Sequence, residues 1–341
     1  MTVQNFSGKD NIKIAIANHY GNGLDKLTWD ERIQWTEATL HNTNGFTKQH
    51  TEDMHTTADE PLLMQKAINA LRDAEAGIPT GYIMGLDATS SGIQIMSCLT
   101  GCERGARNSN LIDTGKREDA YGIATEAMNQ YVTVATPRKD MKEALMTVLY
   151  GSTAEPKRVF GEDTPELAAF YKAISEEFPG AMQCLKDIQS CWQGDVLAHS
   201  WIMPDGHVAK VKVTEMVDKK IEVDELGHAT FTHRAKVNAP SEFGISLAAN
   251  VVHSVDGFIV REMYRRAFVQ DFEILTIHDS FWCSPNHMNK LRANYREILA
   301  EIAESDLLAN ILNQITGRKG TVTKMSDRLP QLIRESNYAL S

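Results

Sequence analysis

The amino-acid sequence predicts an α+β fold that is mostly helical around a small antiparallel sheet. Apolar residues recur at three- and four-residue intervals over several long segments, which is the spacing of amphipathic helices. Two short apolar runs are instead typical of strands: one ends at Asp87, and the other reverses at His278-Asp279. No repeat, low-complexity tract or Pro/Gly-rich linker divides the 341 residues, so we expect one interwoven domain.

The expected helices begin with two amphipathic segments in the N-terminal quarter of the chain. Pro137 opens a further helix, because proline suits a first helical turn, and Gly151 ends it. Ser284 and Pro285 are expected to cap the last of them. In chain order, the expected helices cover residues 30–40, 61–71, 92–99, 137–150, 245–268 and 285–305.

The expected strands end in turns that carry polar residues. Residues 79–87 form a short apolar run that ends on a carboxylate and is followed by a turn and a helix. Residues 272–282 are typical of a tight hairpin with His278-Asp279 at its bend. The segment 199–237 also favours strands, with one turn at Pro204-Asp205-Gly206 and another around Asp218-Lys219-Lys220.

Composition and charge limit the class of protein. No apolar run is long enough to span a bilayer, and the N-terminus lacks a signal-peptide core, so we expect a cytosolic protein. The five cysteines contain no C-x-x-C pair, which favours reduced thiols, mostly in the core. Thirty-five basic against forty-five acidic residues give a net charge of −10, the wrong sign for a general nucleic-acid-binding surface.

Asp87 and Asp279 are candidate metal ligands because each is placed where a strand turns. Two-metal nucleotidyl transfer needs carboxylates that hold two divalent ions about 3.5–4 Å apart. A strand end is rigid on one side and open to a cleft on the other, which suits this task. Each aspartate taken alone is better explained as a turn residue or a helix cap.

The helix that begins at Arg138 adds cations. Successive steps of four residues turn by about 400°, so Arg138, Lys142, Met146 and Tyr150 form one slowly drifting stripe. Cations near phosphates and an aromatic ring near the sugar or base would suit a nucleotide-binding helix. The alternative is an amphipathic helix with a solvated basic edge.

The order and content of these segments resemble the single-subunit RNA polymerases of bacteriophages and mitochondria. Asp87–Gln94 is similar to motif A of that family, Arg138–Gly151 to motif B, and Ile277–Phe281 to motif C. The family's C-terminal segment, which folds back toward the active centre, is similar to residues 333–341. Further similar segments are 23–33, 119–122, 201–206 and 250–257.

The resemblance implies roles for the matching residues. Asp87 and Asp279 would bind two catalytic Mg²⁺ ions, with the Ala88 carbonyl as a further ligand. Cations would hold the incoming triphosphate, and one of them, Lys142, would also protonate the pyrophosphate leaving group. Tyrosine and histidine side chains would select the ribonucleotide and border its site. The implied nucleotide-binding residues are Lys26, Gly92, Tyr121, Arg138, Lys142, Tyr150 and His253.

Two alternatives to an RNA polymerase remain at this stage: a family A-like DNA polymerase fragment and a catalytically inactive scaffold with the polymerase fold. Family A enzymes use a motif A glutamate as a gate against the 2′-hydroxyl, where this chain has Gly92. Met146-Thr147 and His278-Asp279-Ser280 also differ from the family A pattern. These differences favour RNA synthesis, and the filled catalytic positions argue against a scaffold.

The resemblance further implies a right-hand polymerase fold of palm and fingers. We expect residues 1–78 to form the N-terminal helical part of the palm and thumb base, 79–130 the palm with motif A, 131–200 the fingers with motif B, 201–240 a hairpin in the place of the specificity loop, and 241–341 the palm with motif C and a C-terminal foot. The five acidic residues between 208 and 237 make a solvated hairpin at least as plausible as a promoter reader.

The expected partners follow from the same resemblance. They are a DNA template, the RNA product and ribonucleoside triphosphates. Little sequence precedes the segment around Lys26, and the net charge is unfavourable for DNA. We therefore expect the catalytic, larger subunit of a heterodimer in which a smaller subunit supplies N-terminal functions. A recruiter bound to single-stranded DNA would assist it, and the expected location is the cytoplasm of an infected bacterium.

Overall fold

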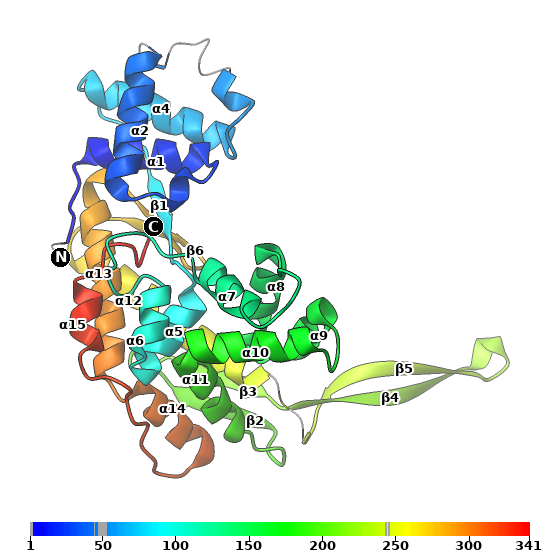
Figure 1. The fold of residues 1–341 in the computed structure, drawn as a ribbon. Helices are drawn as coiled ribbons and strands as arrows, with labels where there is room; N and C mark the ends of the chain where they lie inside the picture. The colour runs from blue at the N-terminus through cyan, green and yellow to red at the C-terminus, as the bar shows by residue number, and fades with distance from the viewer. Residues whose placement is uncertain (1–2, 44, 47–52, 243, 245) are drawn as a thin grey trace.

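The computed structural model describes residues 3–43, 45–46, 53–242, 244 and 246–341. At one end of the molecule, α1 (Gly8–Tyr20), α2 (Trp29–Asn42) and α4 (Pro61–Glu75) pack into a helical lobe (Figure 1). Thr28 starts α2 with a capping box: its side chain accepts from the Glu31 N–H, and the Glu31 carboxylate accepts from the Thr28 N–H. The chain leaves this lobe through β1.

A three-stranded antiparallel sheet lies at the centre, in the order β1 (Met84–Asp87), β7 (Ser280–Cys283) and β6 (Ile274–Ile277). Because side chains alternate along a strand, Met84 and Leu86 enter the core, whereas Asp87 lies on the opposite, open face. The sheet contacts α13 (Met288–Glu304) through β7, and α13 packs in turn on α5 (Ser91–Thr100), where Tyr295 donates a hydrogen bond to Gln94 at 2.7 Å. The sheet thus carries Asp87 on a rigid, well-packed support.

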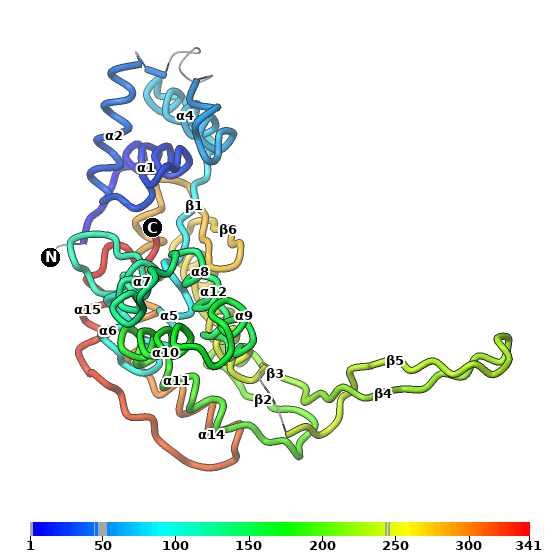
Figure 2. The backbone as a smooth tube through the Cα atoms, turned by 45° about the vertical axis from the view of Figure 1, so that its right-hand side comes forward, coloured from blue at the N-terminus to red at the C-terminus, as the bar shows by residue number. Residues whose placement is uncertain are grey.

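A second group of helices lies on one side of the sheet (Figure 2). Its largest member, α10, places Phe170 in the core of this group, in contact with Phe160 at 5.0 Å between ring centroids. The group comprises α6 (Glu103–Asn108), α7 (Ala120–Asn129), α8 (Arg138–Val148), α9 (Ala154–Phe160), α10 (Pro165–Glu177) and α11 (Pro179–Ser190). On the other side, α12 (Ser246–Val269) packs on α5, α11 and α13.

Two hairpins occupy the segment expected to favour strands. β2 (Ala198–Ile202) and β3 (Val208–Lys212) pair across the turn predicted at residues 204–206. β4 (Thr214–Val223) and β5 (Ala229–Asn238) form a long ribbon that projects from the body (Figures 1 and 2). The turn predicted around residues 218–220 is wrong: β4 continues through it, and Asp218 instead pairs with Arg234 at 3.1 Å. The reversal occurs at 224–228, where Gly227 and His228 supply positive φ angles.

The C-terminal residues close the fold along what we call the C-terminal seam, formed by Trp29, Arg32, Arg292, Asn337 and Tyr338. The Trp29 and Tyr338 rings stack at 5.3 Å, and the Trp29 indole donates to the Asn337 carbonyl at 3.2 Å. Arg292 donates to the same carbonyl at 2.8 Å. The seam leads the last residues to the central sheet; α14 (Leu307–Thr316) and α15 (Leu329–Arg334) precede it.

Most elements expected from periodicity are confirmed within the described residues. The helices expected over 30–40, 61–71, 92–99 and 137–150 match α2, α4, α5 and α8, and that over 245–268 matches α12. The strand expected over 79–87 is shorter, beginning at Met84. The expected Ser284 cap is wrong: its side chain makes no capping bond, and a 3₁₀ turn (Pro285–His287) precedes α13.

Two expectations from composition can also be compared with the structure. All five cysteines are free, and every one except the half-buried Cys191 is buried, as expected for reduced core thiols. No helix among the described residues is both long and apolar enough to cross a bilayer.

Candidate active site

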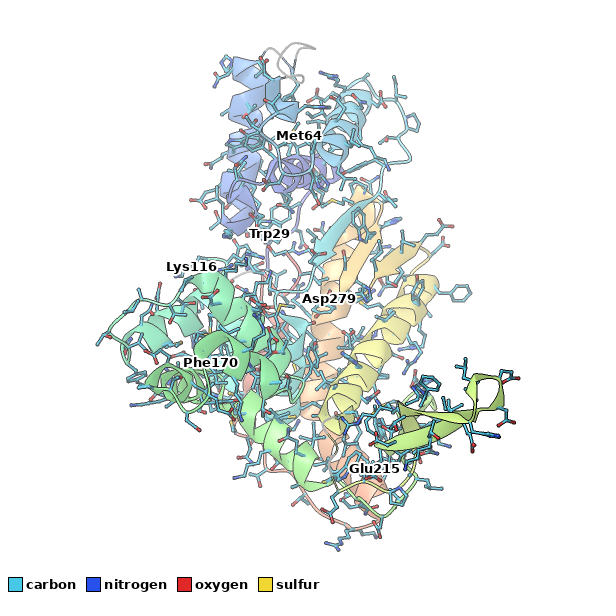
Figure 3. The ribbon with its side chains drawn as sticks, turned by 90° about the vertical axis from the view of Figure 1, so that its right-hand side faces the viewer. Trp29, Met64, Lys116, Phe170, Glu215 and Asp279 are labelled. Atoms are coloured by element: carbon cyan, nitrogen blue, oxygen red, sulfur yellow. The ribbon has the colours of Figure 1, made fainter. Side chains whose placement is uncertain are left out.

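One cavity of about 780 Å³ lies where β1, the β6–β7 hairpin, α8 and α12 face one another. Figure 3 labels Asp279 at this meeting point. All ten residues singled out from the sequence line the cavity: Lys26, Asp87, Ala88, Gly92, Tyr121, Arg138, Lys142, Tyr150, His253 and Asp279. They come from segments up to 253 positions apart in the chain, from Lys26 to Asp279, so the fold, and not the local sequence, brings them together.

Of the two candidate metal ligands, Asp87 ends β1, and Asp279 lies in the turn directly before the neighbouring strand β7. Asp87 lies opposite Ser280 in the β1–β7 register, and the Ala88 N–H donates to the Asp279 carbonyl at 3.1 Å. These backbone bonds fix the two aspartates next to one another across the sheet end. The C-terminus supports the same place, because the Ser341 N–H donates to the Asp87 carbonyl at 2.9 Å.

The turn that presents Asp279 is tight. Only two residues, His278 and Asp279, connect β6 to β7, and His278 adopts a left-handed conformation with φ 55°. A positive φ at the first turn residue matches the twist of the flanking strands, although it costs energy for a residue other than glycine. The hydrogen-bonded hairpin maintains this conformation and thereby aims Asp279 at the cavity.

Cations line another side of the cavity. The Arg138 guanidinium donates two hydrogen bonds to Asp119, from Nε at 2.6 Å and from Nη2 at 2.8 Å. Burial opposes ionisation of Asp119, but the hydrogen bonds and charge of Arg138 outweigh it and lower the pKa of Asp119. The Tyr121 ring also lines the cavity, 5.5 Å from the Arg138 guanidinium carbon and 5.7 Å from Lys142 Nζ.

Tyr150, His253 and Gly92 form a compact group at the end of α8. The Tyr150 and His253 rings lie 5.0 Å apart with an inclination of 46°. A Cβ added at Gly92 would lie 3.4 Å from the Tyr150 hydroxyl oxygen, so the glycine leaves the space beside that hydroxyl open. Burial, and then the carboxylates of Asp256 and Asp279, raise the pKa of Tyr150, which keeps its hydroxyl a proton donor.

The comparison with known proteins agrees with this geometry. The profile of the DNA-dependent RNA polymerase family matches residues 4–160 and 207–337, which include every residue of the candidate site. The chain belongs to the DNA-dependent RNA polymerase family. Within this family, the chain resembles the bacteriophage-type members and their organellar relatives.

Named relatives of the chain come from organelles and phages. It is 24% identical to the chloroplastic/mitochondrial DNA-directed RNA polymerase 2 of Arabidopsis thaliana, over 90% of the chain and 35% of the relative. It is 22% identical to the DNA-directed RNA polymerase of Pseudomonas phage phiKMV, over 95% and 46%, and 22% identical to T7 RNA polymerase of Escherichia phage T7, over 93% and 46%. The chain therefore spans about a third to just under a half of the length of these polymerases.

The chemistry of the acidic residues in the cavity suits divalent cations. Neither carboxylate, Asp87 or Asp279, makes a side-chain hydrogen bond or ion pair with any residue in the described part of the chain. Their charge acts on neighbouring groups: after burial, Asp279 is the next cause that raises the pKa of Asp256. The Ala88 carbonyl accepts from the Ser90 N–H at 3.1 Å and keeps a second lone pair. Hard oxygen ligands with uncompensated charge fit Mg²⁺.

Sequence reasoning missed five charged residues that line the cavity: Asp25, Arg117, Glu118, Asp119 and Asp256. Asp119 and Asp256 lie inside segments quoted for the family resemblance, but their relevance comes from the cation and carboxylate that they face in the fold. Arg117 lies two residues before Asp119 and also lines the cavity. Proximity to the matched segment at 119–122 was the one sequence signal for it.

Proposed function

We propose that this chain carries the catalytic centre for template-directed RNA synthesis from ribonucleoside triphosphates, by two-metal nucleotidyl transfer. The observation that carries the proposal is the gathering of two unpaired aspartates, four cations and a tyrosine–histidine pair around one cavity. Membership of the DNA-dependent RNA polymerase family supports it. The same membership disfavours a DNA polymerase fragment, which was the closest alternative.

Asp87 and Asp279, with the Ala88 carbonyl, would hold two Mg²⁺ ions at the end of the central sheet. When bound, such ions activate the attacking 3′-hydroxyl and stabilise the charge on the leaving pyrophosphate. The contribution of the chain is placement, because both aspartates are fixed by backbone hydrogen bonds before any substrate arrives.

The cations of the cavity would bind the triphosphate, and one of them would protonate the pyrophosphate leaving group. Lys26 and Lys142 make no ion pair with the described residues, so both are free to meet phosphate oxygens. Arg138 is held by Asp119 through two of its N–H groups, which fixes its fork and leaves Nη1 for a phosphate. Lys142 would also supply the proton to the departing pyrophosphate.

Tyr150, His253 and Gly92 would select the ribose. The Tyr150 hydroxyl borders the open space beside Gly92, and the His253 ring lies against the tyrosine. A 2′-hydroxyl could exchange hydrogen bonds with these polar groups, whereas a deoxyribose would leave them unsatisfied. Loss of such a bond is worth about 1–2 kcal/mol, or roughly ten- to thirtyfold in discrimination.

Primer extension on a template, with Mg²⁺ and either rNTPs or dNTPs, tests the proposal. Asp279→Asn keeps the size of the side chain and removes the charge, so we expect extension to fall by at least about 10³-fold. Asp73→Asn, on an exposed part of α4 away from the cavity, is the matched control and should extend normally. Equal activity of Asp279→Asn and the unmodified chain would contradict the metal-ligand role and favour the scaffold alternative. A preference for dNTPs would contradict RNA synthesis.

The smaller subunit and the single-stranded-DNA-binding recruiter stay predictions that rest on the family resemblance. The names of the relatives described above mention no second subunit. Co-expression tests the idea: a partner should raise transcription of duplex DNA above that of this chain alone, and equal transcription would reject it.

Location in the cytoplasm of the infected bacterium is likewise a prediction, which cell fractionation checks.

A further inference from the structure

Arg117, in the loop between α6 and α7, is a cavity cation without a structural partner. Its guanidinium makes no hydrogen bond or ion pair with any residue in the described ranges, and its Nε is shielded from solvent and unsatisfied. A buried polar group of this kind costs about 1–3 kcal/mol, more when charged. The side chain nevertheless lines the same cavity as Asp87 and Lys26. An unsatisfied cation that faces a cavity needs a ligand or another explanation.

Two arginines that are more deeply buried than Arg117 show how this fold treats a structural arginine. Arg32 donates to the Leu27 carbonyl at 3.0 Å, to Asn18 Oδ1 and to Ser341 Oγ, both at 2.9 Å. Arg292 donates to the carbonyls of Gln4 and Asn337. The surrounding oxygens thus accept hydrogen bonds from both of these guanidinium groups. Arg117 lies close enough to Arg32 for their charges to repel, yet it has none of these oxygens.

The charges around Arg117 explain why it is tolerated without a partner. Burial is the main influence on Arg117 and lowers its pKa; the charges of Asp25, Asp119 and Asp87 favour the charged form, and that of Arg138 opposes it. None of these carboxylates lies within ion-pair distance of it. Asp119 is already engaged by two N–H groups of Arg138. The cation is therefore held in place by a negative field and is still available for hydrogen bonding.

The position of Arg117 points to a phosphate group. It shares Asp119 as an electrostatic neighbour with Lys26 and Arg138, the cations assigned to the triphosphate, and it is also influenced by Asp87 at the metal site. A triphosphate that spans from the metals to these cations would pass it. Guanidinium forks suit phosphate oxygens better than any other side chain, since several N–H groups can donate at once.

We propose that Arg117 binds the triphosphate of the incoming nucleotide, as a cation additional to Lys26, Arg138 and Lys142. The inference rests on the proposed function. A nucleic-acid backbone phosphate is the other anion that this cavity would meet, so the test must separate the two.

The test compares Arg117→Gln and Arg117→Lys with Lys116→Gln in steady-state primer extension. Lys116, labelled in Figure 3, is the matched control. It carries the same charge on the same loop, but 68% of its side chain is exposed and it pairs with Glu118 at 3.3 Å. A charge-assisted hydrogen bond is worth about 1.5–3 kcal/mol, so Arg117→Gln should raise the rNTP KM by roughly 10- to 100-fold. It should leave the KM for primer–template unchanged. Arg117→Lys should restore part of the loss, and Lys116→Gln should alter neither KM.

A second readout does not depend on turnover. Inorganic tripolyphosphate with Mg²⁺ should bind the unmodified chain in calorimetry, and Arg117→Gln should weaken that binding by a similar factor. Arg117 makes no bonds to protein groups, so the thermal midpoint of Arg117→Gln should not fall. A rise in the primer–template KM alone would reassign Arg117 to a nucleic-acid phosphate, and a lowered midpoint with unchanged KM values would make it structural; either result overturns the proposal.

Failure of this inference can be told apart from failure of the proposed function. If Asp279→Asn abolishes extension while Arg117→Gln behaves as the unmodified chain, the polymerase assignment stands and the role of Arg117 is rejected. If the unmodified chain does not extend a primer, tripolyphosphate binding still decides whether Arg117 is a phosphate ligand.

Discussion

The cavity and the C-terminal seam use the same kinds of side chain in opposite ways. In the seam, Arg32 and Arg292 are surrounded by carbonyl and hydroxyl oxygens, and Trp29 stacks on Tyr338. In the cavity, Asp87, Asp279 and Arg117 have no such partners among the described residues. A charged group that is fully hydrogen-bonded within the protein stabilises the fold, whereas one that is left unpaired at a cavity is available to a ligand.

The contrast predicts that substitutions in the seam reduce stability and that substitutions in the cavity reduce activity. Both regions meet at the C-terminus, where Ser341 bonds the Asp87 carbonyl through its N–H and Arg32 through its side chain. The two regions are thus close neighbours in space, which makes a separation of effects a demanding test.

The largest expected effect compares two aspartates. Asp87→Asn should reduce primer extension by at least about 10³-fold, because it removes a metal ligand, and should leave the thermal midpoint unchanged. Asp113→Asn, whose carboxylate accepts from Asn337 Nδ2 at 2.6 Å beside the seam, should instead retain activity and lose about 1 kcal/mol of stability. Extension assays and thermal unfolding of both variants check this. A stability loss in Asp87→Asn equal to that of Asp113→Asn would break the contrast.

The next effect compares two arginines changed to the same residue. Arg32→Met leaves several buried oxygens without a donor, so we expect a loss of about 3 kcal/mol in the free energy of unfolding. Arg117→Met removes no bond to the protein and should cost close to zero. Denaturant unfolding of both variants is the measurement, and similar losses for the two would show that Arg117 has a structural role after all.

A third prediction concerns the open face of the central sheet. A Cβ at Gly85 would collide with the Trp282 indole, which lies over it in the β1–β7 pair. Gly85→Ala should therefore cost about 1–3 kcal/mol through overpacking. Gly81→Ala is the matched control, since a Cβ there meets no atom within 4 Å and its φ is not positive. Equal midpoints for the two variants would contradict the close packing at Gly85.

The smallest expected effect depends on pH. Burial, and then the Asp279 carboxylate, raise the pKa of Asp256, while His253 and His278 oppose the rise. A carboxyl whose pKa is higher in the folded state loses stability as pH rises from its unfolded value through its folded one, and the cost persists above that range. Asp256→Asn should therefore stabilise the metal-free protein at neutral pH by at most about 1 kcal/mol, with no gain in acid. Unfolding at several pH values in EDTA measures this; a gain in acid would contradict it.

Local patterns were enough to predict the tight hairpin and some of the helices, whereas α1, α6, α7, α9, α10, α11, α14 and α15 were not predicted. The stripe from Arg138 to Tyr150 follows from helical spacing alone, and the two-residue bend at His278-Asp279 follows from two apolar runs that flank it. The turn predicted around Asp218 was wrong because charged residues in an exposed strand resemble a turn when only the sequence is considered. The ribbon pairs Asp218 with Arg234 across its strands, a contact that no local pattern reveals.

The sequence by itself determined which residues could hold metal ions, phosphates and a ribose, because residue type and spacing decide what chemistry a side chain offers. Only the tertiary structure decided which of them are unpaired and face one cavity. Arg32 and Arg117 are the same residue type in the sequence. In the fold, backbone and side-chain oxygens accept hydrogen bonds from Arg32, whereas Arg117 Nε has no acceptor among the described residues. Hydrogen-bond satisfaction depends on groups distant in the chain, such as Ser341 for Arg32. It therefore becomes visible only once the chain has folded.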